Sequence, residues 1–142
     1  MNLIVWLKKY LFTLLVVAAI LYLSLARTSA PDDMPRIPYA DKIVHFIMYL
    51  GVMLAFYLDV YRQSLSQISF RRRLVWGLFL CVVFGGVVEL LQMYCTSYRT
   101  GDWWDWVADA LGVLAGAWSG RYLVPFVARY LPAFLFDKPR KM

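Results

Sequence analysis

Residues 89–112 read ELLQMYCTSYRTGDWWDWVADALG and join the end of one very apolar run to the start of the next. A carboxylate and an amide, Glu89 and Gln92, close the first run, and three aspartates open the second. Ionisable side chains are costly inside a membrane unless they have partners, so they mark a candidate functional site by default. Whether these runs cross a membrane depends on the rest of the chain.

The composition is that of an integral membrane protein. Hydrophobic residues make up 62% of the 142 residues, and the mean hydropathy is +0.59. Soluble domains are roughly 45–50% apolar, and a soluble domain of this length has too small an interior to bury so many large apolar side chains. Lipid must therefore cover much of the surface, and the length fits one membrane domain, residues 1–142.

The charge and the cysteines exclude two other classes of protein. Lysine and arginine exceed aspartate and glutamate by 15 to 9, a net charge of +6, but basic residues also gather in the cytoplasmic loops of membrane proteins. Without a nucleic-acid-binding motif we expect no nucleic-acid partner. Cys81 and Cys95 lie fourteen residues apart, which favours neither a disulfide framework nor a cysteine metal site.

Hydrophobic runs predict an all-α bundle of four membrane-spanning helices at about residues 8–26, 43–61, 74–94 and 103–124. Between them we expect a proline-containing loop, a polar loop over residues 62–73, and a short loop from Cys95 to Asp102. The first run also fits a secretory signal peptide cleaved near Ala26 or Ala30. Its length favours an uncleaved first helix.

The distribution of basic residues predicts the orientation. Eleven lysines and arginines lie in the N-terminal segment, the loop 62–73 and the residues from Arg121 onward, against four on the other side. Because basic residues favour the cytoplasmic side, both termini are predicted to be cytoplasmic. The loop between the third and fourth helices then faces outward.

The ionisable residues of the third and fourth helices share one depth. Glu89 lies five residues from Tyr94, and Asp109 six from Trp103, which puts both roughly 8–9 Å below the aromatic level at 1.5 Å per residue. On the helical wheel Asp109 shares a narrow arc with Gly112 and Gly116, and small residues spaced by four mark an inward face. With His45 from the second helix, these residues predict a polar cup that opens outward.

We predict that ten residues bind a ligand in this cup: Asp41, Lys42, His45, Tyr49, Glu89, Gln92, Arg99, Asp102, Asp105 and Asp109. Clustered carboxylates cannot all stay ionised in a low dielectric, so they either share a proton or bind a cation. Lys42 and Arg99 are suited to a phosphate. His45, Glu89 and Asp105 are the candidates for acid–base chemistry. A metal is disfavoured, because HExxH-type spacing is absent.

The same residues also admit a purely structural interpretation. Hydrogen bonds between membrane helices contribute about 0.6 kcal/mol each, so a Glu89–Arg99 or His45–Asp105 pair would simply fix the bundle. Asp59, beside Arg62, is expected to reach out of the bilayer from the end of its helix. A scaffolding role would leave the stripe Gly112, Gly116 and Gly120 free for a partner helix.

One arrangement of motifs resembles a known family. Asp41-Lys42-x-x-His45-Phe46-x-x-Tyr49, Glu89-x-x-Gln92, Arg99 with Asp105 six residues later, and then Gly112 and Gly116 resemble the VanZ-like family over about residues 41–117. These small membrane proteins are named for a component of glycopeptide-resistance clusters that lowers sensitivity to teicoplanin. The family typically has an asparagine where this chain has Asp109, which puts any transfer of family chemistry at that position in doubt.

The resemblance implies a cell-envelope role in the cytoplasmic membrane of a bacterium. We therefore expect the cup to bind a membrane lipid headgroup, a lipid-linked cell-wall precursor or a lipidated glycopeptide, without a cofactor or metal and without catalysis. An intramembrane enzyme acting on lipid headgroups is the first alternative, and a structural or scaffolding protein is the second. An ion conduit is disfavoured, because no charged residue lies near the middle of the third or fourth helix.

Overall fold

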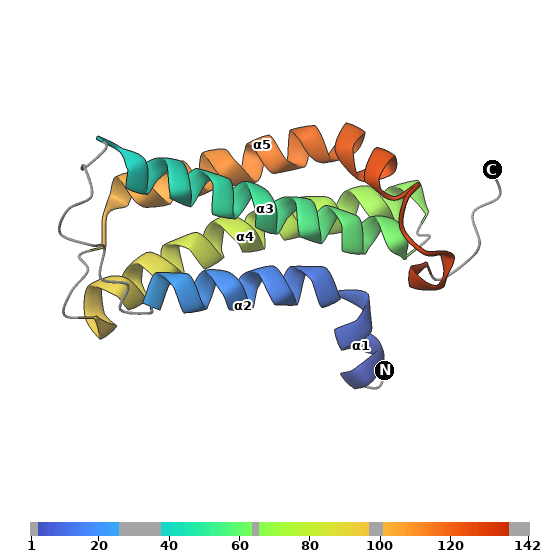
Figure 1. Ribbon diagram of the computed structural model, residues 1–142, viewed down its shortest axis with the longest axis horizontal. Coiled ribbons are helices and arrows are strands. Elements are labelled where there is room, and N and C mark those ends of the chain that lie inside the picture. Colours follow the sequence, from blue (N-terminus) through green and yellow to red (C-terminus); the bar gives the residue numbers. More distant parts are fainter. Residues whose placement is uncertain (1–2, 26–37, 64–65, 97–100, 137–142) are drawn as a thin grey trace.

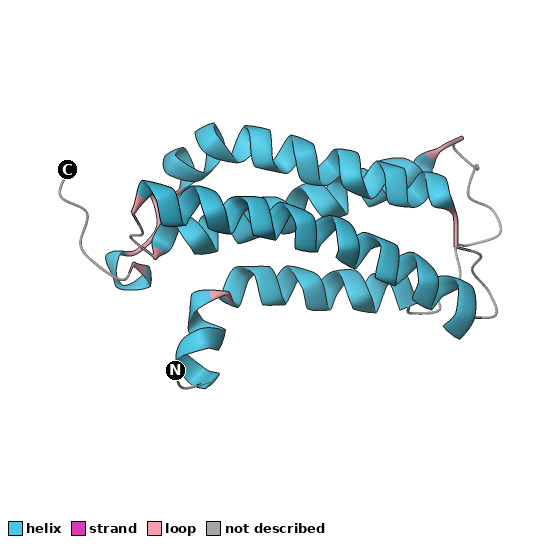
Figure 2. Cartoon of the chain, turned by 180° about the vertical axis from the view of Figure 1, so that it is seen from behind, coloured by secondary structure: helices cyan, strands magenta, loops and turns pink. Residues whose placement is uncertain are grey.

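A computed structural model describes residues 3–25, 38–63, 66–96 and 101–136. Regular structure in these ranges is helical throughout, with no strand (Figure 2). In chain order the helices are α1 (Leu3–Lys9), α2 (Leu11–Leu25), α3 (Ala40–Arg62), α4 (Gln67–Cys95), α5 (Trp103–Val127) and the short 3₁₀ helix η1 (Ala133–Leu135). The predicted all-α class is confirmed.

Three helices are long and apolar enough to cross a membrane, namely α3, α4 and α5, with 23, 29 and 25 residues. The chain is thus a multi-pass membrane protein by helix length and composition. The shorter apolar helix α2 has 15 residues and lies alongside the other three (Figure 1). The four-helix bundle is therefore present, while a fourth crossing by α2 and the orientation of the bundle remain predictions.

The predicted first helix, residues 8–26, contains α2 but is interrupted near its start, because the chain bends at Tyr10 between α1 and α2. The Tyr10 amide donates to the Leu7 carbonyl at 3.3 Å, which is a tighter turn than an α-helix makes. The Tyr10 ring stacks on Phe56 of α3 at 6.0 Å between centroids, and its hydroxyl accepts a hydrogen bond from Arg73 of α4. Contacts with two distant helices therefore set the bend. Residue 26 lies outside the described ranges.

The predicted polar loop over residues 62–73 is also wrong, because α4 begins at Gln67 and includes Arg71, Arg72 and Arg73. The Ser66 hydroxyl caps this helix by accepting the Ser69 amide at 3.3 Å. Charge does not end a helix, since arginine is a good helix former. The C-terminal end of α5 also differs from the prediction. This helix ends at Val127, three residues past the predicted limit, with Pro125 in its last turn.

The closest helix pair is α3 and α5, which lie far apart in the sequence and side by side in Figure 1. The stripe of glycines on α5 makes this approach possible. A Cβ added to Gly112 would collide with the Phe46 carbonyl, and one added to Gly116 would lie 2.8 Å from the Leu50 carbonyl. The predicted inward stripe is confirmed, and the idea that it is free for a partner helix is wrong, because α3 of the same chain covers it.

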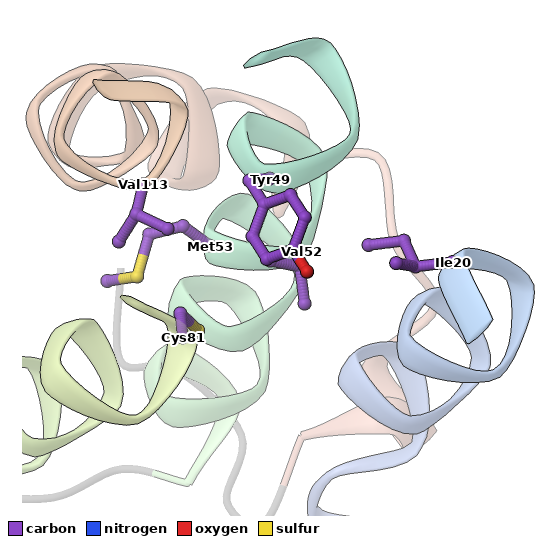
Figure 3. Packing of buried hydrophobic residues seen from close by; sticks show 6 residues of the cluster. All are labelled: Ile20, Tyr49, Val52, Met53, Cys81 and Val113. Atoms are coloured by element: carbon purple, nitrogen blue, oxygen red, sulfur yellow. The ribbon is translucent and has the colours of Figure 1, made fainter. Parts of the chain in front are cut away.

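Side chains from all four bundle helices meet in the centre. Met53 of α3, Val113 of α5 and Cys81 of α4 converge there, and Ile20 of α2 approaches Tyr49 and Val52 from the other side of α3 (Figure 3). The two cysteines are free, Cys81 buried and Cys95 exposed. Since α2 contacts α3 more than α4, it is the least enclosed member of the bundle.

The prediction that Asp59 reaches out of the bilayer is wrong, because its side chain is completely buried. One carboxylate oxygen accepts the amide and the hydroxyl of Thr13, both at 2.8 Å. The other accepts Arg62 Nη1 at 2.9 Å, and Gln63 donates to the Asp59 carbonyl at 3.0 Å. We call these residues, Thr13, Asp59, Arg62 and Gln63, the Asp59 cluster. It joins α2 to the end of α3.

Candidate functional site

At the end of the bundle opposite the Asp59 cluster, Lys42 in the first turn of α3 contacts three carboxylates. Lys42 Nζ lies 2.9 Å from Asp102, 2.9 Å from Asp105 and 3.1 Å from Asp41. An ammonium group has three hydrogens to donate, so these three carboxylates use all of them. Lys42 thereby ties the start of α3 to the start of α5.

One helical turn further along α3, His45 lies buried against two carboxylates. Its Nδ1 is 3.0 Å from Asp109 Oδ1 and 3.6 Å from Glu89 Oε1. The Glu89 Oε2 atom accepts the Asp102 amide at 2.9 Å, which places the last turns of α4 against the start of α5. Three helices thus contribute one ionisable side chain each to a layer beneath Lys42.

The start of α5 is shaped by Asp102, which serves as its N-cap. Asp102 Oδ1 accepts the Trp104 amide at 2.9 Å, as N-cap aspartates do, and Oδ2 accepts from Lys42. The hydrogen bond from Lys42, and secondarily that from the Trp104 amide, hold the pKa of Asp102 below its ordinary value of 3.8. This carboxylate is therefore ionised throughout the physiological range.

Four buried side-chain atoms have no hydrogen-bond partner among the described residues, and each comes from a different bundle helix. They are Ser24 Oγ of α2, Tyr49 Oη of α3, Glu89 Oε1 of α4 and Asp109 Oδ2 of α5. The free Asp109 oxygen faces Gly85, where an added Cβ would lie 2.9 Å away. Buried polar groups are normally paired, so those that are not require an explanation such as a ligand, an ion or a function.

We call the seven ionisable residues at this end the acidic cluster: Asp41, Lys42, His45, Glu89, Asp102, Asp105 and Asp109. The structure places these seven side chains together at one end of the bundle, and their binding of a ligand remains a prediction. The pairing differs from the one expected, because His45 contacts Asp109, and Asp105 contacts Lys42 instead of His45. Asp109 is one turn deeper in α5 than Asp105 and completely buried, which puts it level with the imidazole.

Two predicted site residues, Gln92 and Tyr49, have their contacts outside the acidic cluster. Gln92 donates to the Ser24 carbonyl at 3.1 Å. It therefore joins α4 to α2, as expected from the structural interpretation of hydrogen bonds between membrane helices. Tyr49 is buried one turn beyond His45, with its ring against Phe84. Arg99 lies outside the described residues, and so does the predicted Glu89–Arg99 pair.

Sequence reasoning missed Ser24, which accepts a hydrogen bond from Gln92, and the Asp59 cluster at the other end. Ser24 is a small residue in an apolar run and carries no signal of its own, whereas helical geometry already places Gly85 on the face of Glu89 and Gln92. For the Asp59 cluster a signal existed, because aspartate and arginine spaced by three share a helix face.

Among the described residues, two groups of side chains are close enough to hold a metal ion. The ligand atoms of His45, Glu89 and Asp109 lie within 4.8 Å of one another, as do those of Asp41, Asp102 and Asp105. In the second group Lys42 Nζ already contacts all three carboxylates. In the first group a metal would have to displace the proton between His45 and Asp109, since ligating imidazole must be deprotonated at that nitrogen. The expectation that no metal binds remains a prediction.

An apolar groove lies beside the acidic cluster, between the end of α4 and the start of α5. Its volume is about 290 Å³, and Val83, Val87, Leu90 and Trp106 contribute to its walls. Glu89 and Asp102 also line it. The groove therefore brings an apolar surface directly to two members of the acidic cluster.

The fold and this cluster define a multi-pass helical membrane protein with a carboxylate-rich site at one end of the bundle. The family model described as VanZ/LLP1 matches residues 2–124, and the chain belongs to this family. The predicted VanZ-like membership is confirmed, over more of the chain than residues 41–117.

One relative is a fission yeast protein named Uncharacterized protein C11E3.10, from Schizosaccharomyces pombe. It is 35% identical over 79 residues, which are 54% of this chain and 43% of that protein. The match thus spans less than half of the relative's length. No solved structure matches the chain. Because this relative is eukaryotic, the similarity does not support the expected bacterial origin.

Proposed function

We propose that the acidic cluster binds the headgroup of a membrane lipid or of a lipid-linked envelope component, and that it recognises a positively charged group such as a primary amine. The observation that carries this proposal is the imbalance of charge. Five carboxylates surround Lys42 and His45, and the buried Glu89 Oε1 has no hydrogen-bond partner among the described residues. A cation would neutralise this excess.

A phosphate group fits Lys42 less well than the sequence suggested. All three ammonium hydrogens of Lys42 are directed to carboxylates, so a phosphate would have to break these hydrogen bonds and approach Asp102 and Asp105. Like charges at such short range repel strongly where water is scarce. An amine, in contrast, would add to the existing network.

The neighbouring groove suits the apolar part of such a ligand. Small-molecule sites are mostly apolar with a few polar groups that fix orientation, and the groove at Val87 and Leu90 meets the cluster at Glu89 and Asp102. An amphiphile could thus lie along α4 with its headgroup at the start of α5. A link to the response to glycopeptide antibiotics, which are themselves amphiphiles when lipidated, remains a prediction from the family name.

The test compares two lipids, one with and one without an ammonium group. Purified protein in nanodiscs is titrated with fluorescent phosphatidylethanolamine and with its N-acetylated form, which lacks the ammonium group. We expect acetylation to weaken binding tenfold or more, since hydrogen bonds to charged groups contribute about 1.5–3 kcal/mol and 1.4 kcal/mol corresponds to tenfold. Equal binding of the two lipids would refute recognition of an amine.

Three variants sharpen this experiment. Asp105→Asn should weaken binding of the amine, while Asp41→Asn serves as the matched control, because the Asp41 side chain is 58% exposed against 12% for Asp105. Lys42→Met should strengthen binding of the amine, because it frees three carboxylates. Weaker binding in Lys42→Met would instead indicate that the lysine itself contacts the ligand.

An intramembrane enzyme acting on lipid headgroups is the second candidate, favoured by the 3.0 Å contact between His45 and Asp109. A carboxylate on one imidazole nitrogen orients the ring for proton transfer at the other. Release of a labelled headgroup by purified protein, lost in His45→Ala and retained in Asp41→Asn, would establish catalysis. Saturable binding without any product would support a binding protein.

A further inference from the structure

A cavity of the described part of the chain lies far from the acidic cluster, near the bend between α1 and α2. Its volume is about 530 Å³, within the usual range for small-molecule sites. Val17 of α2, Val52 and Phe56 of α3, and Leu80 and Phe84 of α4 line its apolar length. Trp6, Arg72, Arg73 and Trp76 line its other end. We call this cavity the α2–α4 groove.

The groove exists because α2 packs on α3 and only sparsely on α4. At Gly77 of α4 the Phe56 ring packs so close to the backbone that an added Cβ would collide with it. That ring is held on its other side by stacking on Tyr10. The groove is therefore built by specific packing between α1–α2, α3 and α4.

The length of the groove matches one lipid chain. On α4 the wall runs from Arg72 to Phe84, a separation of twelve positions, which is about 18 Å along a helix. Half of the hydrocarbon core of a bilayer measures about 15 Å. One acyl chain of one leaflet thus fits between the arginines and the middle of the bundle.

The arginines at the mouth carry charge that no carboxylate of the described residues neutralises through an ion pair. Arg73 Nη1 donates to the Gln63 side-chain oxygen at 2.6 Å and to the Tyr10 hydroxyl at 3.1 Å, both neutral acceptors. Arg72 is exposed beside it. By contrast, Arg62 in the neighbouring Asp59 cluster has a carboxylate at 2.9 Å. Two unneutralised guanidinium groups at the end of an apolar groove call for an anion with an apolar tail.

We propose that the α2–α4 groove binds a glycerophospholipid of net negative charge. One acyl chain lies along Val17, Leu80 and Phe84, and the phosphate contacts Arg72 and Arg73. This site differs from the acidic cluster in position and in the sign of its charge, so it does not depend on the function proposed above. The bound lipid would fill the side of the bundle where α2 leaves α4 uncovered.

The experiment uses delipidated full-length protein in a mild detergent, titrated with dioleoyl phosphatidylglycerol or dioleoyl phosphatidylcholine and followed by native mass spectrometry. We expect the first phosphatidylglycerol to bind at least about fivefold more tightly than phosphatidylcholine, because each basic residue near a membrane surface contributes about that factor. Equal affinities would overturn the proposal. Soluble glycerol phosphate should not compete, and competition by it would show a site for the headgroup alone.

Two pairs of variants locate the site. Arg72→Gln should reduce the preference for phosphatidylglycerol about fivefold, while Arg71→Gln, an exposed neighbour that does not line the groove, should leave it unchanged. An equal loss in both would reduce the effect to general basic charge and overturn the proposal.

The second pair tests the acyl chain. Leu80→Trp should fill the groove and lower affinity for both lipids, while Val75→Trp on the same helix should not, since Val75 is 68% exposed and outside the groove. Both positions are surface positions, so melting temperatures should match the wild type. Unchanged lipid binding in a folded Leu80→Trp protein would overturn the placement of the chain.

Discussion

The two ends of the bundle each bury charged side chains, and they do so in opposite ways. In the Asp59 cluster the buried carboxylate accepts hydrogen bonds from Thr13 and Arg62, and Arg62 also donates to the Leu135 carbonyl at 2.8 Å. In the acidic cluster carboxylates outnumber cations, and Glu89 and Asp109 each retain a buried oxygen without a partner among the described residues.

This difference separates a polar group that holds the fold together from one that is available for a ligand. In the Asp59 cluster both carboxylate oxygens accept hydrogen bonds, and breaking such a buried ion pair is costly. An incompletely satisfied cluster carries a cost in the folded state that a bound cation can relieve. The comparison therefore predicts that mutations in the Asp59 cluster lower stability without changing binding. Mutations in the acidic cluster should weaken binding with little change in stability.

The largest effect on stability is expected at Asp59. Asp59→Ala leaves Arg62 buried without its carboxylate, which should lower the free energy of unfolding by about 3–5 kcal/mol. Thermal denaturation in detergent measures the loss. Binding of phosphatidylethanolamine per folded molecule should be unchanged, and a loss of binding without a loss of stability would break the comparison.

At the other end, Glu89→Gln should have its main effect on binding. The substitution retains the shape of the side chain while removing one of several crowded negative charges, so we expect the free energy of unfolding to change by less than about 1 kcal/mol. Affinity for the amine-bearing lipid should fall about tenfold or more. Parallel titration and thermal denaturation check both. Unfolding in proportion to lost binding would make the acidic cluster structural.

A smaller effect is expected at Gln92, which belongs to neither cluster. Gln92→Leu removes the hydrogen bond to the Ser24 carbonyl and should cost about 0.6 kcal/mol, the average for such bonds between membrane helices. Lipid affinity should stay at the wild-type level. A change in affinity would show that Gln92 belongs to the ligand site, although its contacts lie outside the acidic cluster.

The smallest expected effect is the pH dependence of the contribution that Asp102 makes to stability. Its lowered pKa means that the folded state binds the proton less tightly than the unfolded state, so its contribution to stability is complete above its ordinary value of 3.8 and disappears as the pH falls through the lower folded-state pKa. The difference in melting temperature between wild type and Asp102→Asn should therefore shrink on acidification below about pH 4. A difference that grows with acidification would contradict this assignment.

Much of this architecture could be predicted from the sequence, because lipid imposes length and polarity on each spanning helix. The depth and the shared face of Glu89, Asp109 and Gly112 follow from helical geometry alone. The hydrogen-bond partner of His45 could not be predicted in this way. One helical turn decides whether His45 meets Asp105 or Asp109, and a hydropathy pattern does not give the relative height of two helices.

The errors elsewhere have the same origin. Asp59 looked like an end residue because its partner Thr13 lies in a different apolar run, 46 residues away. The bend at Tyr10 depends on Phe56 and on Arg73, which lies 63 residues away in the chain. Local patterns describe each helix separately, and contacts between helices decide which polar groups are satisfied.

The close approach of α3 and α5 across Gly112 and Gly116 also has a consequence for how the protein is made. Membrane helices insert individually and associate afterwards, and α4 lies between these two in the chain. The tightest helix pair therefore forms only after α5 has entered the bilayer. Until then His45 and Glu89 lack Asp109, so the acidic cluster is completed only when α5 packs against α3 and α4.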